Sequence, residues 1–302
     1  MNRFGIAALA ISAAIFTAPA FGQGQQDFSK VEVKTTDLGH NTYMLEGAGG
    51  NVTIAAGTNG AIMVDSQFAP MHDKLKAAIA AVTNQPVKYL INTHYHGDHT
   101  GGNAAFGKEG ATIVAQENVK ERLLHPQPGA NGQTPPVTPP EALPVQVFKD
   151  KTTVSIGGRT AQIGYLPNAH TDGDSYVYFP DANVLATGDL NGAQRNYTNP
   201  DIRGGGGING IVAGFDTLLK VANNQTKVVP GHGPLATRAD LVATRAVLVT
   251  IRDRVAKMKA AGMSEDQVVA AKPAADVQAQ RHADDMASER FVRLVYQTVD
   301  KK

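Results

Sequence analysis

The sequence contains no cysteine among its 302 residues. The chain therefore forms no disulfide, carries no lipid-modified cysteine and offers no thiolate to a metal ion. A metal site in this protein has to be built from imidazole and carboxylate groups, and that combination suits zinc.

Tryptophan is also absent, and aromatic residues make up only 6% of the chain. This scarcity argues against a stacking surface for single-stranded nucleic acid. The 28 basic and 27 acidic residues leave a formal charge of +1, which gives no electrostatic basis for binding nucleic acid or a membrane face. We therefore expect a small-molecule substrate, no nucleic-acid partner and no stable membrane anchor.

The first twenty residues have the features of a secretory signal. A short basic start, Asn2-Arg3, precedes an apolar run, and Ala18-Pro19-Ala20 forms a plausible cleavage site. The run is shorter than the roughly 20 apolar residues that a membrane-spanning helix needs. We expect export, to the periplasm or medium, with cleavage near Ala20 and a flexible mature N-terminus over residues 21–30.

Three histidines and an aspartate lie within six residues, in the segment 94–99. They follow an apolar run, 87–91, that is typical of a buried strand, and precede a Thr-Gly-Gly-Asn break. In an extended segment, residues two apart point the same way, so His94 and His96 can bind one ion. Asp98 and His99 follow the turn at Gly97 and can reach a second ion. The alternative, a surface loop that happens to be rich in histidine, gives these clustered groups no structural use.

This H-x-H-x-D-H pattern resembles the metallo-β-lactamase superfamily, and the other motifs of that family follow in order. Asp65 ends an apolar strand, His170 lies in Asn-Ala-His-Thr, Asp189 follows a strand ending in Thr-Gly, and His232 lies in Pro-Gly-His-Gly. The resemblance covers about residues 30–236.

The resemblance implies a four-layer αβ/βα sandwich, of mixed α+β and α/β character, with the metals at the sheet edges between its halves. It implies two Zn²⁺ ions per chain, one bound by His94, His96 and His170 and the other by Asp98, His99 and His232. Asp189 would bridge them, and Asp65 would orient a metal-binding loop, its alternative role being a helix N-cap. Asp98 and Asp189 would act as the catalytic groups, orienting a metal-bridging hydroxide.

Two departures from the β-lactamases bear on the substrate. Asp189 stands where one subclass has a cysteine, and residues 191–197 contain no lysine to hold a β-lactam carboxylate. Arg195 or Arg203 is a candidate for that role, with the alternative that each is an ordinary surface arginine. The best-guess activity is hydrolysis of a β-lactam amide, with slow turnover. The alternatives are hydrolysis of a thioester, lactone or phosphodiester, or a non-catalytic metal- or ligand-binding role in an exported pathway.

Strand and helix patterns alternate along the chain and place the hydrolase domain at residues 31–261, with a C-terminal helical extension at 262–302 packed on it. The first predicted strand is 31–33, and a glycine-rich hairpin turn occupies 47–51. The proline-rich stretch 125–144 predicts a lid, a substrate-binding loop or a mobile excursion. Four consecutive glycines at 204–207 predict a mobile loop, with phosphate binding as a weaker alternative. The remaining histidines, His40, His72, His125 and His282, belong to no metal motif.

Overall fold

The computed structural model describes residues 27–128, 132, 134–192 and 196–301. Within these residues, one sheet has seven strands in sequence order: β1 (Lys34–Gly39), β2 (Thr42–Glu46), β3 (Val52–Ala56), β4 (Ala61–Val64), β5 (Val87–Ile91), β6 (Thr112–Gln116) and β7 (Gln146–Phe148). A second sheet has five, in the order β12 (Lys227–Val229), β11 (Val184–Ala186), β10 (Ser175–Phe179), β9 (Arg159–Tyr165) and β8 (Lys151–Ile156). The predicted signal segment lies outside the described residues.

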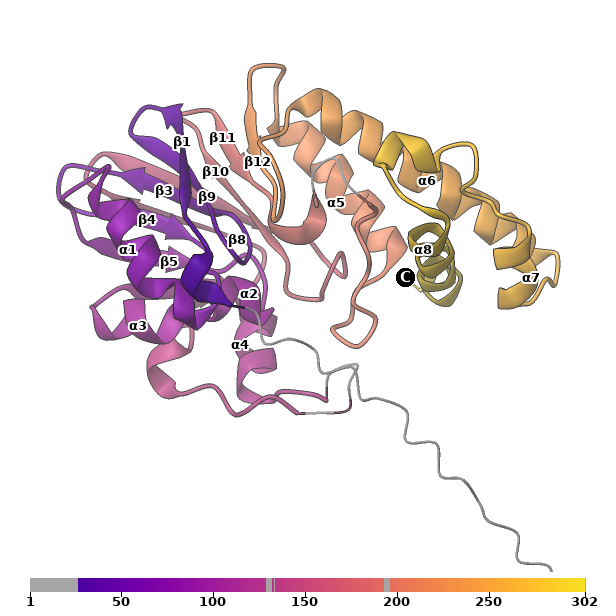
Figure 1. Cartoon of the computed structure of the whole chain (residues 1–302), viewed down its shortest axis with the longest axis horizontal. Coiled ribbons are helices and arrows are strands. Elements are labelled where there is room, and N and C mark those ends of the chain that lie inside the picture. The colour runs from indigo at the N-terminus through magenta and orange to yellow at the C-terminus, as the bar shows by residue number, and fades with distance from the viewer. Residues whose placement is uncertain (1–26, 129–131, 133, 193–195, 302) are drawn as a thin grey trace, which may run out of the picture.

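Helices cover the outer faces of both sheets (Figure 1). The helices, in chain order, are α1 (His72–Ala80), α2 (Gly97–Thr100), α3 (Asn103–Lys108), α4 (Glu117–Leu124), α5 (Ile208–Val221), α6 (Arg238–Ala260), α7 (Glu265–Ala270) and α8 (Asp285–Thr298). The result is the predicted four-layer αβ/βα sandwich.

Strand β4 shows why the layers stack in this way. All four of its residues are buried, because both faces of the sheet are covered. Ile62 and Val64 belong to the core between the two sheets, whereas Ala61 and Met63 pack with α1 and α3 on the outer face. The alternation of side chains along the strand thus supplies two separate cores from one apolar run.

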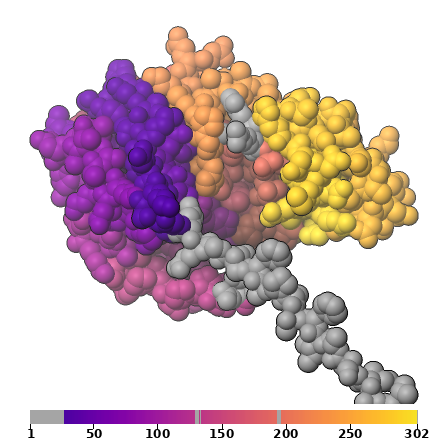
Figure 2. Space-filling view, in the orientation of Figure 1, coloured from indigo at the N-terminus to yellow at the C-terminus, as the bar shows by residue number. Residues whose placement is uncertain are grey.

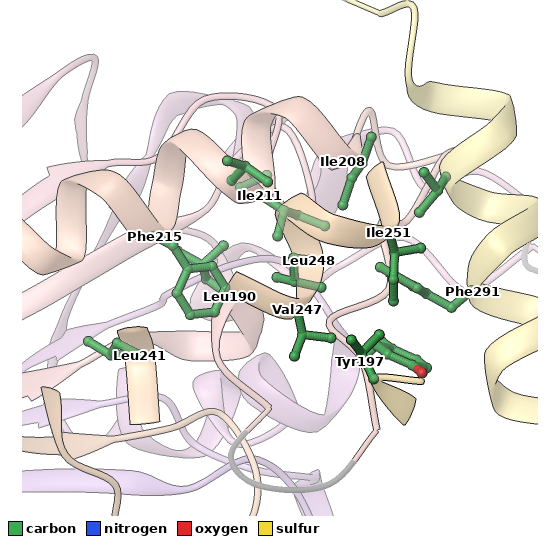
Figure 3. Close-up of a cluster of buried hydrophobic side chains, with 14 of the residues drawn as sticks. Leu190, Tyr197, Ile208, Ile211, Phe215, Leu241, Val247, Leu248, Ile251 and Phe291 are labelled. Atoms are coloured by element: carbon green, nitrogen blue, oxygen red, sulfur yellow. The ribbon is translucent and has the colours of Figure 1, made fainter. Parts of the chain in front are cut away.

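The outer core of the second sheet is shared by α5, α6 and α8. Figure 3 shows Phe215 of α5, Leu248 of α6 and Phe291 of α8 in one buried cluster. The Tyr197 ring stacks on the Phe291 ring with centroids 4.4 Å apart. In the space-filling view, the C-terminal helices lie on the opposite side of the molecule from the first sheet (Figure 2). No helix in the described part of the chain is long and apolar enough to span a membrane.

The predicted strand at 31–33 is wrong, since the first strand begins at Lys34. The carbonyl groups of Phe28, Ser29 and Val31 instead accept hydrogen bonds from the Lys74 ammonium group, at 2.6–2.8 Å. Lys74 on α1, rather than a neighbouring strand, is the hydrogen-bond donor to these carbonyl groups. The hydrophobic pattern of the segment does not reveal this partner.

Strand direction brings distant segments to one edge. β4 and β5 are parallel, so Asp65 and the segment 92–99 leave the first sheet at the same edge. In the second sheet, β9 and β11 are both antiparallel to β10, and β12 is parallel to β11, so His170, Asp189 and His232 also follow strand ends on one side. The carboxyl ends of such strands are the usual location of a ligand site.

We expect the C-terminal helices to unfold together with the domain. Phe291→Ala empties a fully buried position and should destabilise the protein by about 3–5 kcal/mol. Met286→Ala on the same helix, where the side chain is 76% exposed, should change stability by about 0.5 kcal/mol or less. Denaturant unfolding followed by circular dichroism measures both, and equal midpoints for the two variants would contradict the prediction.

Candidate metal centre

The first group of donors consists of three imidazoles. His94 and His96 come from the loop after β5, and His170 comes from the loop between β9 and β10. His96 Nδ1 lies 3.1 Å from His94 Nε2 and 3.1 Å from His170 Nε2. Three ring nitrogens therefore converge on one point from two separate sheets.

The outward nitrogens of these imidazoles determine which ring atoms carry protons. His170 Nδ1 donates to the carbonyl oxygen of Asn199 at 2.7 Å, and His96 Nε2 donates to Asp201 Oδ2 at 3.0 Å. His94 Nδ1 lies 3.1 Å from Thr93 Oγ1. With the outward nitrogens protonated, the three inward nitrogens present lone pairs, as ligation of a cation requires.

The second group consists of Asp98 and His99, at the start of α2, and His232, after β12. His99 Nε2 lies 3.3 Å from His232 Nε2, and Asp98 Oδ2 lies 3.2 Å from His232 Nε2 and 3.7 Å from His99 Nε2. His99 is fully buried, whereas the His232 side chain is 43% exposed. The second group is thus open on the side of His232.

Asp189 lies between the two groups and gives one oxygen to each. Its Oδ2 faces His94 Nε2 and His170 Nε2 at 3.9 and 3.7 Å. Its Oδ1 faces His99 Nε2 and His232 Nε2 at 3.1 and 3.3 Å. The structure therefore brings together all seven predicted ligands, with Asp189 in the predicted bridging position.

The spacing of the donors fits zinc. Four ligands at zinc's usual bond lengths in a tetrahedron lie about 3.3–3.4 Å apart, and the separations among the second group and Asp189 Oδ1 range from 3.1 to 3.7 Å where they are within contact distance. Asp189 Oδ1 is buried and makes no hydrogen bond within the described part of the chain. A buried carboxylate oxygen is costly without a partner, and a cation between it and the imidazoles would supply one.

Asp65 connects the ligand loop to the second group. Its carboxylate accepts hydrogen bonds from the Thr93 backbone N–H at 2.8 Å, from Thr93 Oγ1 at 2.7 Å and from His99 Nδ1 at 2.8 Å. The residue has φ +60°, a left-handed conformation that costs energy outside glycine. These contacts match the predicted orienting role rather than a helix cap, since the following helix begins at His72.

The glycine-rich hairpin at 47–51 joins β2 to β3 and contacts both ligand loops. The Gly50 N–H donates to Asp98 O at 2.9 Å, and the Asn51 N–H donates to Gly231 O at 2.7 Å. The Asn51 side-chain amide donates to Pro230 O at 3.0 Å and to Gly233 O at 2.8 Å. Asn51 is 7% exposed, so it holds the loop that carries His232 from both sides of that residue.

Glycine is required where the backbone approaches the ligands most closely. A Cβ atom on Gly50 would lie 2.2 Å from the His99 ring, and one on Gly231 would lie 2.0 Å from Asp189 Oδ1. Any side chain at either position would push a ligand aside. The hairpin is therefore part of the wall of the centre rather than a plain turn.

Comparison with known proteins agrees with this geometry. The family model described as the metallo-beta-lactamase superfamily matches residues 36–237. The chain belongs to the metallo-β-lactamase superfamily. Its members are metal-dependent hydrolases, and every proposed ligand falls inside the matched range.

Two relatives illustrate the breadth of the superfamily. The 2,4-dinitroanisole O-demethylase subunit alpha of Nocardioides sp. (strain JS1661) is 28% identical over 135 residues, 44% of this chain and 38% of that protein. The hydroxyacylglutathione hydrolase of Polaromonas sp. (strain JS666 / ATCC BAA-500) is 26% identical over 195 residues, 61% of this chain and 66% of that protein. The chain spans less than two thirds of either relative.

A solved structure supports the fold. The metallo-β-lactamase from Pontibacter korlensis superposes with a TM-score of 0.58 and 21% identity, covering 72% of this chain and 99% of that one. The family model ends before α6, so helices α6–α8 lie beyond the matched range. The predicted domain boundary at residue 261 stays a prediction.

Two residues that help to orient the candidate metal ligands were not predicted from the sequence. They are Asn51 and Asp201. Asp201 accepts hydrogen bonds from His96 Nε2 and, at 2.5 Å, from the Tyr95 hydroxyl, and these bonds hold the pKa of its carboxyl far below the usual value despite burial. Neither residue belongs to a recognisable motif. Their ligand partners lie more than a hundred residues away in the chain, so short-range spacing carried no signal.

The structure describes only one of the two arginines that the sequence predicts to bind substrate. Arg195 lies outside the described residues. Arg203 lines a cavity beside His96, and its Nη1 donates to Pro128 O at 3.1 Å. Its role in binding substrate stays a prediction. The histidines outside the motifs, His40, His72, His125 and His282, belong to neither donor group.

The glycine run at 204–207 is packed against the His170 loop. A Cβ atom on Gly206 would lie 2.2 Å from His170 O. The N–H groups of Asp201 and Gly207 donate to His170 O and Ala169 O at 2.7 and 3.0 Å. Close backbone approach therefore accounts for glycine here without any appeal to mobility.

Charges in the centre shift the titration of its groups in opposite directions. Burial, together with neighbouring imidazoles, lowers the pKa of His94 well below its usual value. Burial also lowers the pKa of His232, but its close contacts with the Asp189 and Asp98 carboxylates outweigh this effect and raise that pKa to about 9. Burial raises the pKa of Asp189, yet the facing imidazoles, His99 foremost, hold it well below the usual value.

These shifts predict a different pH dependence for the two metal positions. Zinc must displace a proton from His232, whose pKa is raised to about 9, and another from His99, whose pKa the facing carboxylates raise well above the usual value despite burial, so affinity at the second group should fall at least tenfold for each unit of decreasing pH. His94 is already neutral at pH 7, so the first group should be less sensitive. Zinc titration against a competing chelator at pH 6, 7 and 8 measures both affinities. Equal pH slopes would contradict the prediction.

Asn51→Ala should weaken zinc binding at the second group by about 10–100-fold, because the loop carrying His232 loses two hydrogen bonds. The same chelator titration measures this effect. Asn59→Ala, at an exposed turn position, is the matched control and should bind zinc normally. Unchanged affinity in Asn51→Ala would show that the hairpin does not hold the ligand loop.

Proposed function

We propose that this protein is a zinc-dependent hydrolase that attacks carbonyl substrates, with two Zn²⁺ ions per chain. The observation that supports this most directly is the division of the Asp189 carboxylate between two complete donor groups. Ions bound in this arrangement would acidify a water molecule and polarise the carbonyl oxygen of the substrate.

The two aspartates have separate tasks in this proposal. Asp189, with a side chain 17% exposed, keeps its charge because four imidazoles surround it, and it holds the two positions at a fixed separation. The Asp98 side chain is more exposed, at 26%, and borders His232 at the open side of the centre. Asp98 is therefore the better placed of the two to orient the attacking water and to pass its proton towards solvent.

The first substrate class to test is the β-lactam amide. Membership of the superfamily favours it, whereas the aspartate at position 189 and the lack of lysine in residues 191–197 favour slow turnover. Thioesters, lactones and phosphodiesters are the alternative substrates. The similarity to a hydroxyacylglutathione hydrolase is the reason to test this wider set. The signal segment that the sequence predicts at 1–20 supports an exported location for this reaction.

Turnover with and without metal tests the proposal. The zinc-loaded protein should hydrolyse a chromogenic cephalosporin, lose activity on treatment with a chelator and regain it when zinc is returned. Asp189→Asn should lose most of this activity, because it weakens the contact to both donor groups at once. Asp276→Asn, at an exposed ion pair with Arg254, is the matched control and should retain activity.

The remaining outcomes separate the alternatives. Turnover of a thioester, a lactone or bis-p-nitrophenyl phosphate, without turnover of the cephalosporin, would support the proposed hydrolase function but assign a different substrate class. Two zinc ions per chain with no turnover of any of these substrates would overturn the proposal in favour of a metal-binding protein without catalysis.

A further inference from the structure

A cavity of about 510 Å³ adjoins the first donor group. His96 and Gly97 of the metal-binding loop line it, together with helix α4, the proline-rich stretch and residues of the segment 201–203. Its volume falls in the range of about 300–1,000 Å³ that is usual for small-molecule sites. The cavity therefore begins at the metal-binding loop and continues away from it.

Apolar atoms provide most of the exposed surface of the cavity, although several lining residues are polar. Four prolines, a leucine and a tyrosine provide the apolar surface: Pro126, Pro128, Pro135, Pro136, Leu123 and Tyr95. Proline has no backbone N–H and a fixed φ, so it presents an apolar wall without an unmet donor and with little freedom to lose on binding. The sequence left the proline-rich stretch open between a lid, a substrate-binding loop and a mobile excursion.

The charged groups near the cavity are engaged with one another. Arg122 donates to both Asp172 oxygens, at 3.2 and 2.6 Å, and Asp201 accepts hydrogen bonds from Tyr95 and His96. Arg122 Nη1 also donates to Arg203 O at 3.2 Å, which ties α4 to the segment after Asp201. Arg122, Arg203 and Asp201 line the cavity, and Asp172, which lies outside the lining, neutralises Arg122. With Asp172 counted, the formal charges around the cavity cancel.

We propose that this cavity binds an uncharged apolar group of the substrate, next to the bond that is broken at the metal centre. The inference rests on the proposed hydrolase function and adds the substrate class, namely esters or amides with an apolar acyl or aryl group. An apolar group gains free energy by leaving water for these walls, and the reacting carbonyl is then held beside His96.

A series of 4-nitrophenyl esters with acyl chains of two to ten carbons tests this with the zinc-loaded protein. Each methylene buried in the cavity should raise kcat/KM about fourfold until the cavity is filled. Leu123→Glu, which places a charge in the wall, should abolish the rise of kcat/KM with chain length. Val242→Glu exchanges a partly exposed apolar residue on α6, outside the cavity, and should behave as wild type.

Gly97→Leu provides a second variant that fills the cavity instead of charging it. A Cβ atom at Gly97 meets nothing within 4 Å, and Gly97 lines the cavity, so a side chain can start there without displacing neighbours. It should lower kcat/KM for the longest esters at least tenfold and shorten the chain length at which activity levels off. Zinc content per chain, measured on each variant, confirms that the metal-binding loop is intact.

Direct binding separates failure of this inference from failure of the proposed function. N-phenyl-1-naphthylamine, a neutral fluorescent probe, should bind the wild type with and without zinc and bind Leu123→Glu at least tenfold more weakly. Probe binding without hydrolysis of any ester would support an apolar binding site but contradict the proposed ester hydrolysis. Ester hydrolysis that does not depend on chain length, together with equal probe binding by Leu123→Glu and wild type, would overturn the inference.

Discussion

The site depends on one electrostatic arrangement, the burial of the Asp189 carboxylate among four imidazoles. A carboxylate and several imidazoles in a largely buried space are stable only if charges and lone pairs are matched, because desolvation of each group is costly. Asp189 faces His94 and His170 with one oxygen and His99 and His232 with the other. Removal of any one of these groups would leave the others with an uncompensated charge or lone pair, so the cluster functions as a unit.

The rest of the fold holds these side chains in place despite the repulsion between like groups in the cluster. Parallel strand ends deliver the ligand segments to one edge, and each inward-facing nitrogen of the first group is fixed by a hydrogen bond on the opposite side of its ring. The hairpin at 47–51 then ties the loops of Asp98 and His232 together through Gly50 and Asn51. Backbone strain at Asp65 is the cost of this precision, and three hydrogen bonds to its carboxylate offset it.

Ligand identity was readable from the sequence, but ligand support was not. His94, His96, Asp98 and His99 share one short motif, and His170, Asp189 and His232 were named as candidate ligands because the segments around them resemble motifs of the superfamily. Asn51 and Asp201 act on ligands that are distant in the chain, and their contacts exist only once the two sheets are packed. The strand predicted at 31–33 failed for a similar reason, because Lys74 of α1, distant in the chain, binds the carbonyl of Val31 together with those of Phe28 and Ser29 just before it.

The C-terminal helices are connected to the centre by the segment 196–201, although they hold none of the proposed ligands. Residues 196–201 contain Asn199, the acceptor for His170, and Asp201, the acceptor for His96. Asn196 exchanges backbone and side-chain hydrogen bonds with Arg281, and the Tyr197 ring stacks on Phe291, with its hydroxyl 3.0 Å from Ser288 Oγ. A segment anchored at one end in the helical layer thus fixes the outward nitrogens of two ligands. The helices beyond the matched family range therefore help to determine the orientation of the first donor group, by way of the backbone rather than by direct contact.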